Sequence, residues 1–287
     1  MALKEGWTGR VYEDFEVGDI YQHPLGRTVL ISTGQVYLVT EPAKRVYREV
    51  DSRRALMREP APGGFDHAQW RYGVGKRAAE SVFMSLRRNH GVRGVILRLP
   101  VLQGEGDPTL RLWAWLERLL DGAPVLLAGG GTRPTRFLDV ADVARLIERL
   151  AGGAWPRGAL YNLAAPRATS LRRFLALAAR AAGVRPRFAS APAATFSRLG
   201  LDLEAWPYAG RWSSVLDPSR AKRDLGFTGT PPEDFLPRVV RWHLEHRPNR
   251  SHPSYAQRAA ECAAVERLRA SHDGIRADLP GPEPGIA

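Results

Sequence analysis

The chain has 287 residues, and 44% of them are hydrophobic, which is enough for a sizeable core in one or two domains. No run of about 18 apolar residues is present, so no membrane span is predicted. The N-terminal sequence MALKEGWTGR also lacks the apolar run of a signal peptide.

The net charge is +12, and almost all of the positive side chains are arginine. Nucleic-acid binding is one interpretation of such a charge. We favour an arginine-rich coding bias, because the arginines are dispersed and no stacking aromatics lie between them. The single Cys262 excludes an internal disulfide and fits a cytoplasmic protein. His243 and His246 lack further ligands at metal-site spacing, so no metal is expected.

Residues 7–29 are polar and rich in turn signals. The run Tyr12-Glu-Asp-Phe-Glu-Val-Gly-Asp19, followed by Gly26-Arg-Thr28, resembles the N-terminus of MaoC-like hydratases. The catalytic Asp and His motif of that family has no counterpart further along. Residues 1–29 are therefore expected to be a leader or fusion segment, with a hydratase as a minor alternative. Residues 10–15 are its candidate edge strand.

Residues 28–33 (TVLIST) are β-branched and apolar, which predicts a buried strand. Thr33 stands at its C-terminal end, where open parallel sheets bind ligands. Its hydroxyl could bind a reacting oxygen or only satisfy its own turn. Residues 38–67 are predicted to form a long loop.

Residues 68–91 predict an amphipathic helix whose apolar face carries Ala79, Val82, Phe83 and Leu86. Asp66 is the expected N-cap, with Gln69 completing a capping box.

This helix contains Tyr72-Gly-Val-Gly-Lys76, and a spacing of four residues places both polar side chains on one face. An ammonium group beside the phenol favours the phenolate, so Tyr72 can exchange a proton with a substrate hydroxyl. The alternative is an ordinary surface pair.

The later part of the chain alternates short strands with helices, which predicts α/β architecture. Residues 129–131 (GGG) are not a dinucleotide loop, because Arg133-Pro134 follows them. The expected strands are 94–99, 125–127 and 161–163, with a loop at 100–108. The expected helices are 109–121, 136–150, one capped by Thr169 or Ser170 and ending at Ala182, 217–226, 233–246 and 253–270, before a disordered tail.

From about residue 29 to 245 the chain resembles the second half of extended short-chain dehydrogenases/reductases of the NAD-dependent epimerase/dehydratase family. The matching segments, in order, are Ile31-Ser-Thr-Gly-Gln-Val-Tyr37, Tyr72 with Lys76, Arg98 with Gly104, Phe137 to Val143, Tyr161-Asn162-Leu163, Asp217-Pro-Ser-Arg-Ala and Leu225-Gly-Phe227.

The resemblance implies catalytic roles for Thr33, Tyr72 and Lys76. Thr33 would orient the substrate oxygen and Tyr72 would be the general acid/base. Lys76 would hold the nicotinamide ribose of NAD or NADP, with Pro100 and Val101 beside the nicotinamide. No metal is implied.

The sequence departs from the family at the substrate site. Gly34-Gln35 replace the Asp-Glu of the dehydratases, which disfavours sugar 4,6-dehydration. Thr135-Arg136 replace the family's Arg-Asp, and its Arg-Pro-Gly-Asp stretch is missing near residues 206–215. Arg136 and Arg211 are the remaining candidates for substrate binding.

The family's G-x-x-G-x-x-G loop has no counterpart in this sequence. We therefore expect a partial, doubly wound Rossmann-like sheet lacking its first strands, over residues 30–248, with a small C-terminal substrate subdomain. Residues 249–287 would form a helix and tail. The expected function is an NAD(P)-dependent epimerase-like oxidoreductase acting on a sugar or nucleotide-sugar hydroxyl and impaired as a lone chain.

The alternative is a non-catalytic remnant that serves as a binding module. The expected partners are a small sugar-like molecule and a second copy or another chain that covers the exposed sheet edge. Neither nucleic acid nor membrane is an expected partner.

Overall fold

The computed structural model describes residues 3–5, 20–22, 27–41, 46–153 and 155–270. Most of the predicted leader lies outside these ranges, including the candidate strand at 10–15. The predicted tail at 271–287 lies outside them as well. Of the first 26 residues, only the short parallel strands β1 (Leu3–Glu5) and β2 (Ile20–Gln22) are described.

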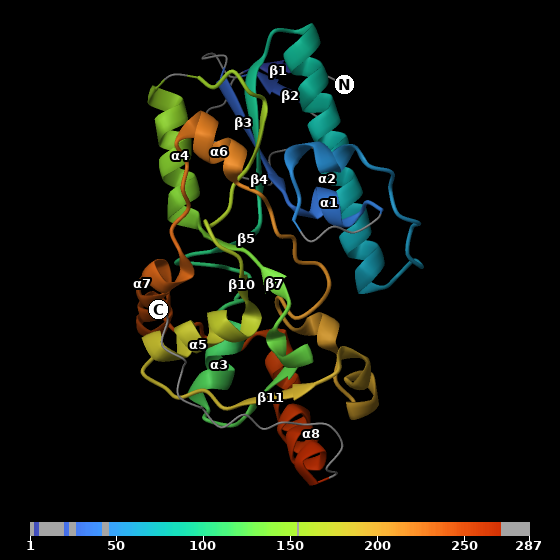
Figure 1. The fold of residues 1–287 in the computed structure, drawn as a ribbon, viewed down its shortest axis with the longest axis vertical. Helices are drawn as coiled ribbons and strands as arrows, with labels where there is room; N and C mark the ends of the chain where they lie inside the picture. The colour runs from blue at the N-terminus through green and yellow to red at the C-terminus, as the bar shows by residue number, and fades with distance from the viewer. Residues whose placement is uncertain (1–2, 6–19, 23–26, 42–45, 154, 271–287) are drawn as a thin grey trace.

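A parallel sheet in the order β3-β4-β9 forms the upper part of the molecule (Figure 1). Its strands are β3 (Arg27–Thr33), β4 (Arg93–Leu99) and β9 (Leu160–Asn162). β4 is buried at every residue after the first, as its continuous apolar run predicts for a central strand. The strands expected at 28–33 and 94–99 are confirmed, but the predicted burial of the first is wrong, because β3 is mostly half-buried and Ile31 is 40% exposed.

Helices cover both faces of this sheet (Figure 1). One side carries α1 (Gln35–Leu38) and α2 (Phe65–Asn89), and the other carries α4 (Val140–Gly152) and α6 (Ser219–Leu225). Between β4 and α4, Leu97 and Leu146 are fully or almost fully buried in one core cluster. Parallel strands with helices on both faces make a doubly wound α/β arrangement.

The start and the buried face of α2 differ from the sequence prediction. The helix begins at Phe65 with Gly64 as N-cap and no side-chain cap, so the predicted Asp66 cap is wrong. Ala79 and Val82 are exposed rather than buried. Phe83 is buried, because its ring packs directly on Gly94 of β4. The ring lies 2.3 Å from the position that a Cβ on this glycine would occupy.

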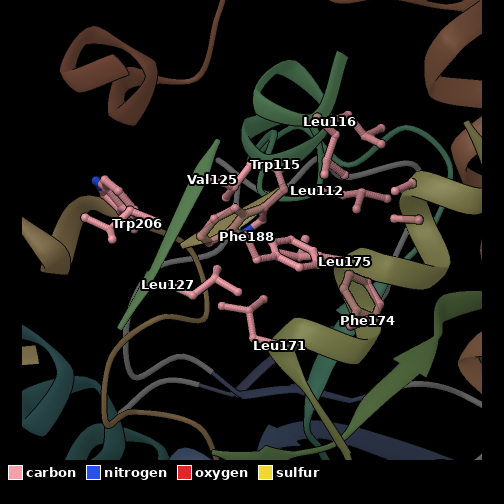
Figure 2. Packing of buried hydrophobic residues seen from close by; sticks show 14 of the residues in the cluster. Leu112, Trp115, Leu116, Val125, Leu127, Leu171, Phe174, Leu175, Phe188 and Trp206 are labelled. Carbon is pink, nitrogen blue, oxygen red and sulfur yellow. The ribbon is translucent and has the colours of Figure 1, made fainter. Parts of the chain in front are cut away.

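The lower part of the molecule contains the larger core, built around the parallel pair β6–β11. Its elements are β6 (Val125–Ala128), β11 (Phe188–Ala191), α3 (Trp113–Leu120), α5 (Leu171–Ala181), α7 (Pro232–Glu245) and α8 (Arg258–Ala270). Figure 2 shows Trp115 and Phe188 meeting in this core, with Phe174 reaching in from α5. Ser170 caps α5 by accepting a hydrogen bond from the Arg173 N–H at 3.2 Å, as expected.

Two short strand pairs link the upper and lower parts. They are β5 (Val101–Gln103) with β8 (Phe137–Asp139), which are parallel, and β7 (Pro134–Thr135) with β10 (Thr169–Ser170), which are antiparallel. The predicted loop at 100–108 is therefore wrong over β5. The helix expected from residue 136 begins only at Val140, after the Asp139 N-cap.

Short 3₁₀ turns complete the described chain. They are η2 (Glu49–Arg53), η3 (Gly129–Gly131), η4 (Ala193–Thr195), η5 (Ser197–Leu199), η6 (Leu203–Ala205) and η7 (Pro253–Gln257). None of the described helices combines the length and the apolar character that crossing a membrane requires.

Candidate active site

The predicted catalytic threonine lies at the C-terminal end of β3. Thr33 Oγ1 accepts a hydrogen bond from the Gln35 N–H at 3.2 Å. One of its lone pairs therefore satisfies the turn after the strand, which was the alternative to ligand binding. The hydroxyl proton and the second lone pair remain available to a ligand. The Gly34 N–H donates to the Leu99 carbonyl at 2.8 Å, which brings Pro100 close to Thr33.

The helical pair Tyr72 and Lys76 approaches the same strand end. Lys76 Nζ donates to the carbonyl of Ile31, two residues before Thr33, at 3.2 Å. Tyr72 lies one turn earlier on α2, and 49% of its side chain is exposed. The fold therefore gathers Thr33, Lys76 and Pro100 at one end of the sheet, with Tyr72 one helical turn away.

Gly73 allows α2 to lie directly on the segment after β3. A Cβ at this position would be 2.6 Å from the Val39 side chain and 2.9 Å from the Gln35 carbonyl. Both distances are shorter than packed atoms tolerate. The glycine beside Tyr72 thus sets how closely α2 approaches the strand end.

A buried ion pair lies beneath these residues and escaped the sequence prediction. Arg98 of β4 donates from Nε and Nη2 to the two oxygens of Glu80 on α2, at 2.9 and 2.5 Å, and Ser32 Oγ donates to the same carboxylate at 2.5 Å. Burial alone would lower the pKa of Arg98, but its hydrogen bonds with Glu80 raise it above its usual value. The signal in the sequence was a single charge inside the apolar run GVILRL.

The same guanidinium continues the network to the far strand of the sheet. Arg98 Nη1 donates to the Tyr37 hydroxyl, which donates to Asn162 Oδ1 on β9, both at 2.6 Å. The Asn162 N–H donates to Glu49 Oε1 at 2.9 Å. Burial raises the pKa of Tyr37 well above its usual value, so this hydroxyl stays protonated and acts as a scaffold.

The two arginines predicted to bind substrate are engaged elsewhere. Arg136 Nη1 donates to the backbone carbonyls of Ala165 at 2.5 Å and Pro166 at 3.3 Å. Burial lowers the pKa of Arg136. Arg211 forms a salt bridge with Asp66 of α2, with Nη2 and Oδ2 2.8 Å apart.

One chain segment connects the strand end with a cavity in the lower part. A Cβ on Gly34 would lie 2.0 Å from Ser214 Oγ, so residue 214 runs against the turn after Thr33. The neighbouring Ser213 lines a small cavity. The other lining residues are Trp115, Leu126, Leu127, Ala128, Gly131, Arg133, Thr135, Leu171, Trp206, Tyr208 and Ala209. Within the described ranges, no cluster of His, Cys, Asp or Glu could hold a metal ion.

Comparison with known proteins gives one family match. Residues 22–164 match the model of the NAD dependent epimerase/dehydratase family. Among curated proteins, no sequence matches significantly.

The fold is similar to those of several solved structures. UDP-glucuronic acid 4-epimerase from Bacillus cereus, in complex with NAD, is 17% identical, with a TM-score of 0.53 over 78% of this chain and 62% of that chain. UDP-glucose 4-epimerase from Thermotoga maritima, with UDP-glucose, is 20% identical, with a TM-score of 0.56 over 77% and 64%. RMD from Pseudomonas aeruginosa, complexed with NADPH, is 22% identical, with a TM-score of 0.51 over 76% and 66%.

At these identities the likeness concerns the fold, an α/β arrangement with parallel sheets like those of Rossmann-type epimerases. The chain spans between 62% and 66% of the length of these three relatives.

Proposed function

This chain belongs to the NAD dependent epimerase/dehydratase family through residues 22–164, and from this premise we propose that it binds a sugar nucleotide and handles the proton of a sugar hydroxyl. The hydrogen bond between Lys76 and the Ile31 carbonyl carries the proposal. It holds the predicted acid/base helix against the strand that ends in Thr33. In parallel α/β sheets, ligands bind at this end of the strands.

Each of the three residues has a distinct task in this proposal. Tyr72 takes the proton from the substrate hydroxyl as the phenolate and returns it as the phenol, and its exposure leaves it open to a ligand. Lys76, four residues later on α2, would hold the ribose of the nicotinamide. The Thr33 hydroxyl donates to the substrate oxygen and orients it.

The residues after Thr33 favour an epimerase-like reaction over elimination. Gly34 has no side chain, and the Gln35 amide is buried and donates to the Gln69 carbonyl at 3.5 Å. No carboxylate stands in these two positions to remove the proton that 4,6-dehydration requires.

The relatives suggest the class of substrate. Structures of similar fold hold UDP-glucose or UDP-glucuronic acid. In this chain the cavity lined by Arg133 and Thr135 is connected to the strand end through Ser213 and Ser214. We place the nucleotide part of the substrate on the cavity side and the sugar near Tyr72.

The residues present fit only one end of a nicotinamide dinucleotide. Lys76, Tyr72, Pro100 and Val101 would hold the nicotinamide and its ribose, and the nicotinamide would supply hydride transfer. The sequence has no G-x-x-G-x-x-G loop for the pyrophosphate. The three glycines of η3 lead into β7 rather than a helix. The chain by itself is therefore expected to bind NAD or NADP weakly.

This partial fit supports a second candidate function, a binding module without turnover. In that case the chain would bind sugar nucleotides as the first proposal states. Substitution of Tyr72 would then have no catalytic consequence.

Calorimetry with UDP-glucose and NAD⁺, followed by assays of epimerisation, tests both candidates. We expect Tyr72→Phe to keep the UDP-glucose Kd within about twofold and to lower kcat by about 100-fold or more, because it removes only the proton-transfer group. Binding without turnover in either protein would favour the binding module. Failure to bind any sugar nucleotide would contradict both candidates.

The sheet edge bears on the partner prediction. We propose that a second copy or another chain covers β3, since Ile31 is 40% exposed and backbone groups at this edge lack a paired strand among the described residues. Sedimentation analysis of the purified chain tests whether a second copy covers β3. A chain that sediments strictly as a monomer would show that no second copy covers this edge.

A further inference from the structure

The cavity in the lower part is closed to anything of nucleotide size. Its volume is about 20 Å³, which accommodates little more than one water molecule. Residues 206–213, which we call the strap, contribute Trp206, Tyr208, Ala209 and Ser213 to its lining. A larger ligand can enter only if the strap moves.

Two buried polar groups in the lining point to a polar ligand. Thr135 Oγ1 and Trp206 Nε1 have no hydrogen-bond partner among the described residues. Thr135 is 4% exposed and Trp206 is 2% exposed. Buried groups of this kind normally have a partner, and a bound ligand or water supplies it.

The two ends of the strap are held differently. Near its start, the buried Trp115 donates from Nε1 to the Pro207 carbonyl at 3.0 Å. Further on, the exposed contact from Arg133 Nη1 to the Gly210 carbonyl is longer, at 3.3 Å. Within the lower part of the molecule, the strap is thus held more weakly at residue 210 than at residue 207.

This end of the strap is fastened to α2 through Asp66. Arg211 donates from Nε to Oδ1 at 3.2 Å and from Nη2 to Oδ2 at 2.8 Å. Trp212 Nε1 also donates to Oδ1, at 2.5 Å, and the Arg211 guanidinium lies 4.4 Å from the Trp212 ring centre. Burial would raise the pKa of Asp66, but these hydrogen bonds lower it, so the carboxylate is charged at neutral pH.

We propose that Asp66 is a positioning residue that latches the strap over the cavity. When the ligand enters, the phosphates of the sugar nucleotide replace the Asp66 carboxylate as the partner of the Arg211 guanidinium. This rests on the proposed function, which supplies the anionic ligand. Phosphate oxygens bind a guanidinium in the same two-pronged manner as a carboxylate. Asp66 and Tyr72 share α2, so the exchange links cavity occupancy to the helix that carries the acid/base group.

The latch itself is tested without ligand. Asp66→Asn keeps the shape of the side chain and removes its charge, and we expect amide hydrogen exchange in residues 209–216 to become about two- to fivefold faster, the range for losing an exposed ion pair. Glu233→Gln is the matched control, because it removes a similar exposed contact, with Arg167, away from the strap. Unchanged exchange in Asp66→Asn would overturn the latch.

Competition for Arg211 is tested by comparing UDP with uridine. We expect Asp66→Asn to bind UDP about two- to fivefold more tightly than wild type, because no ion pair must be broken first. The gain in uridine affinity in Asp66→Asn should be smaller. Arg211→Gln should lose affinity for UDP but not for uridine. Equal or weaker UDP binding by Asp66→Asn overturns the competition.

Absence of UDP binding in every variant, alongside faster exchange in Asp66→Asn, refutes the proposed function. It also refutes the phosphate exchange that depends on it.

Discussion

At the scale of single residues, the Arg98–Glu80 pair is the feature on which the site rests. Both side chains are almost fully buried, and they join β4 to α2. We expect Glu80→Ala to destabilise the protein by about 3–5 kcal/mol, because it leaves a buried guanidinium without its counter-charge. Urea unfolding measures this.

Glu233→Ala is the comparison for that experiment. Its partner Arg167 is exposed, so the loss should be below about 1 kcal/mol. Similar losses for both variants would contradict the structural role assigned to Glu80.

The sequence predicts roles for Thr33, Tyr72 and Lys76 but not the contacts between distant residues. Tyr-x-x-x-Lys is a local spacing, whereas Arg211 and Asp66 are 145 positions apart. The Asp66 carboxylate accepts hydrogen bonds from Arg211 and Trp212 instead of from the N–H groups of the helix N-terminus. A cap prediction considers only neighbours in sequence, so it could not anticipate this competition.

At the scale of elements, the two glycines of α2 should respond oppositely to the same change. Gly75→Ala meets open space, so removing the glycine should stabilise the helix by about 0.5–1 kcal/mol. Gly73→Ala meets Val39 and the Gln35 carbonyl, so overpacking should cost about 1–3 kcal/mol and shift Tyr72. Thermal unfolding of both variants tests this, and equal shifts in Tm would contradict the packing.

Helices and strands with strong local signals were predicted well. β3 and β4 were apparent from continuous apolar runs, and α5 from its Ser170 cap. β5 was not, because a three-residue strand exists only through its pairing with β8, more than thirty positions away. The buried face of α2 was misjudged because a glycine and a carboxylate, Gly73 and Glu80, occupy it.

At the scale of the whole molecule, arginine side chains contribute more to holding the fold together than their dispersed positions in the sequence indicated. Arg118 and Arg258 are buried in the lower part and bind Glu261 of α8 at 2.9 Å each. Glu261 also accepts the Leu126 N–H of β6 at 3.0 Å. These bonds join α8 to the larger core, so part of the net charge stabilises the fold rather than covering helix surfaces.

Global stability should fall in mildly acidic solution because of His243. This side chain is 1% exposed, and burial lowers its pKa despite the opposing effect of Asp107, the Gly104 backbone and Glu105. Above about pH 6.5 the imidazole is neutral in both the folded and the unfolded chain. Below that value the unfolded chain takes up the proton first, so stability declines until the folded group also titrates.

Urea unfolding at pH 7.5 and pH 5.5 measures this decline. His243→Leu should reduce it, since a leucine takes up no proton. Most carboxylates titrate nearer pH 4, but burial raises the pKa of Glu117, which opposes the decline, and burial lowers the pKa of His252, which adds to it. An equally steep decline in His243→Leu would assign the effect to another group.

The contact of Lys76 with β3 has a consequence for solubility. The Gly34 N–H faces β4, so by alternation the backbone groups of Ile31 and Thr33 point away from it, toward the edge that no described strand covers. A cation at such an edge is a gatekeeper that discourages strands of other molecules from adding to it. Replacing Lys76 by an uncharged residue would therefore promote aggregation as well as remove a group with a proposed catalytic role, and an inactive variant must first be shown to be monodisperse.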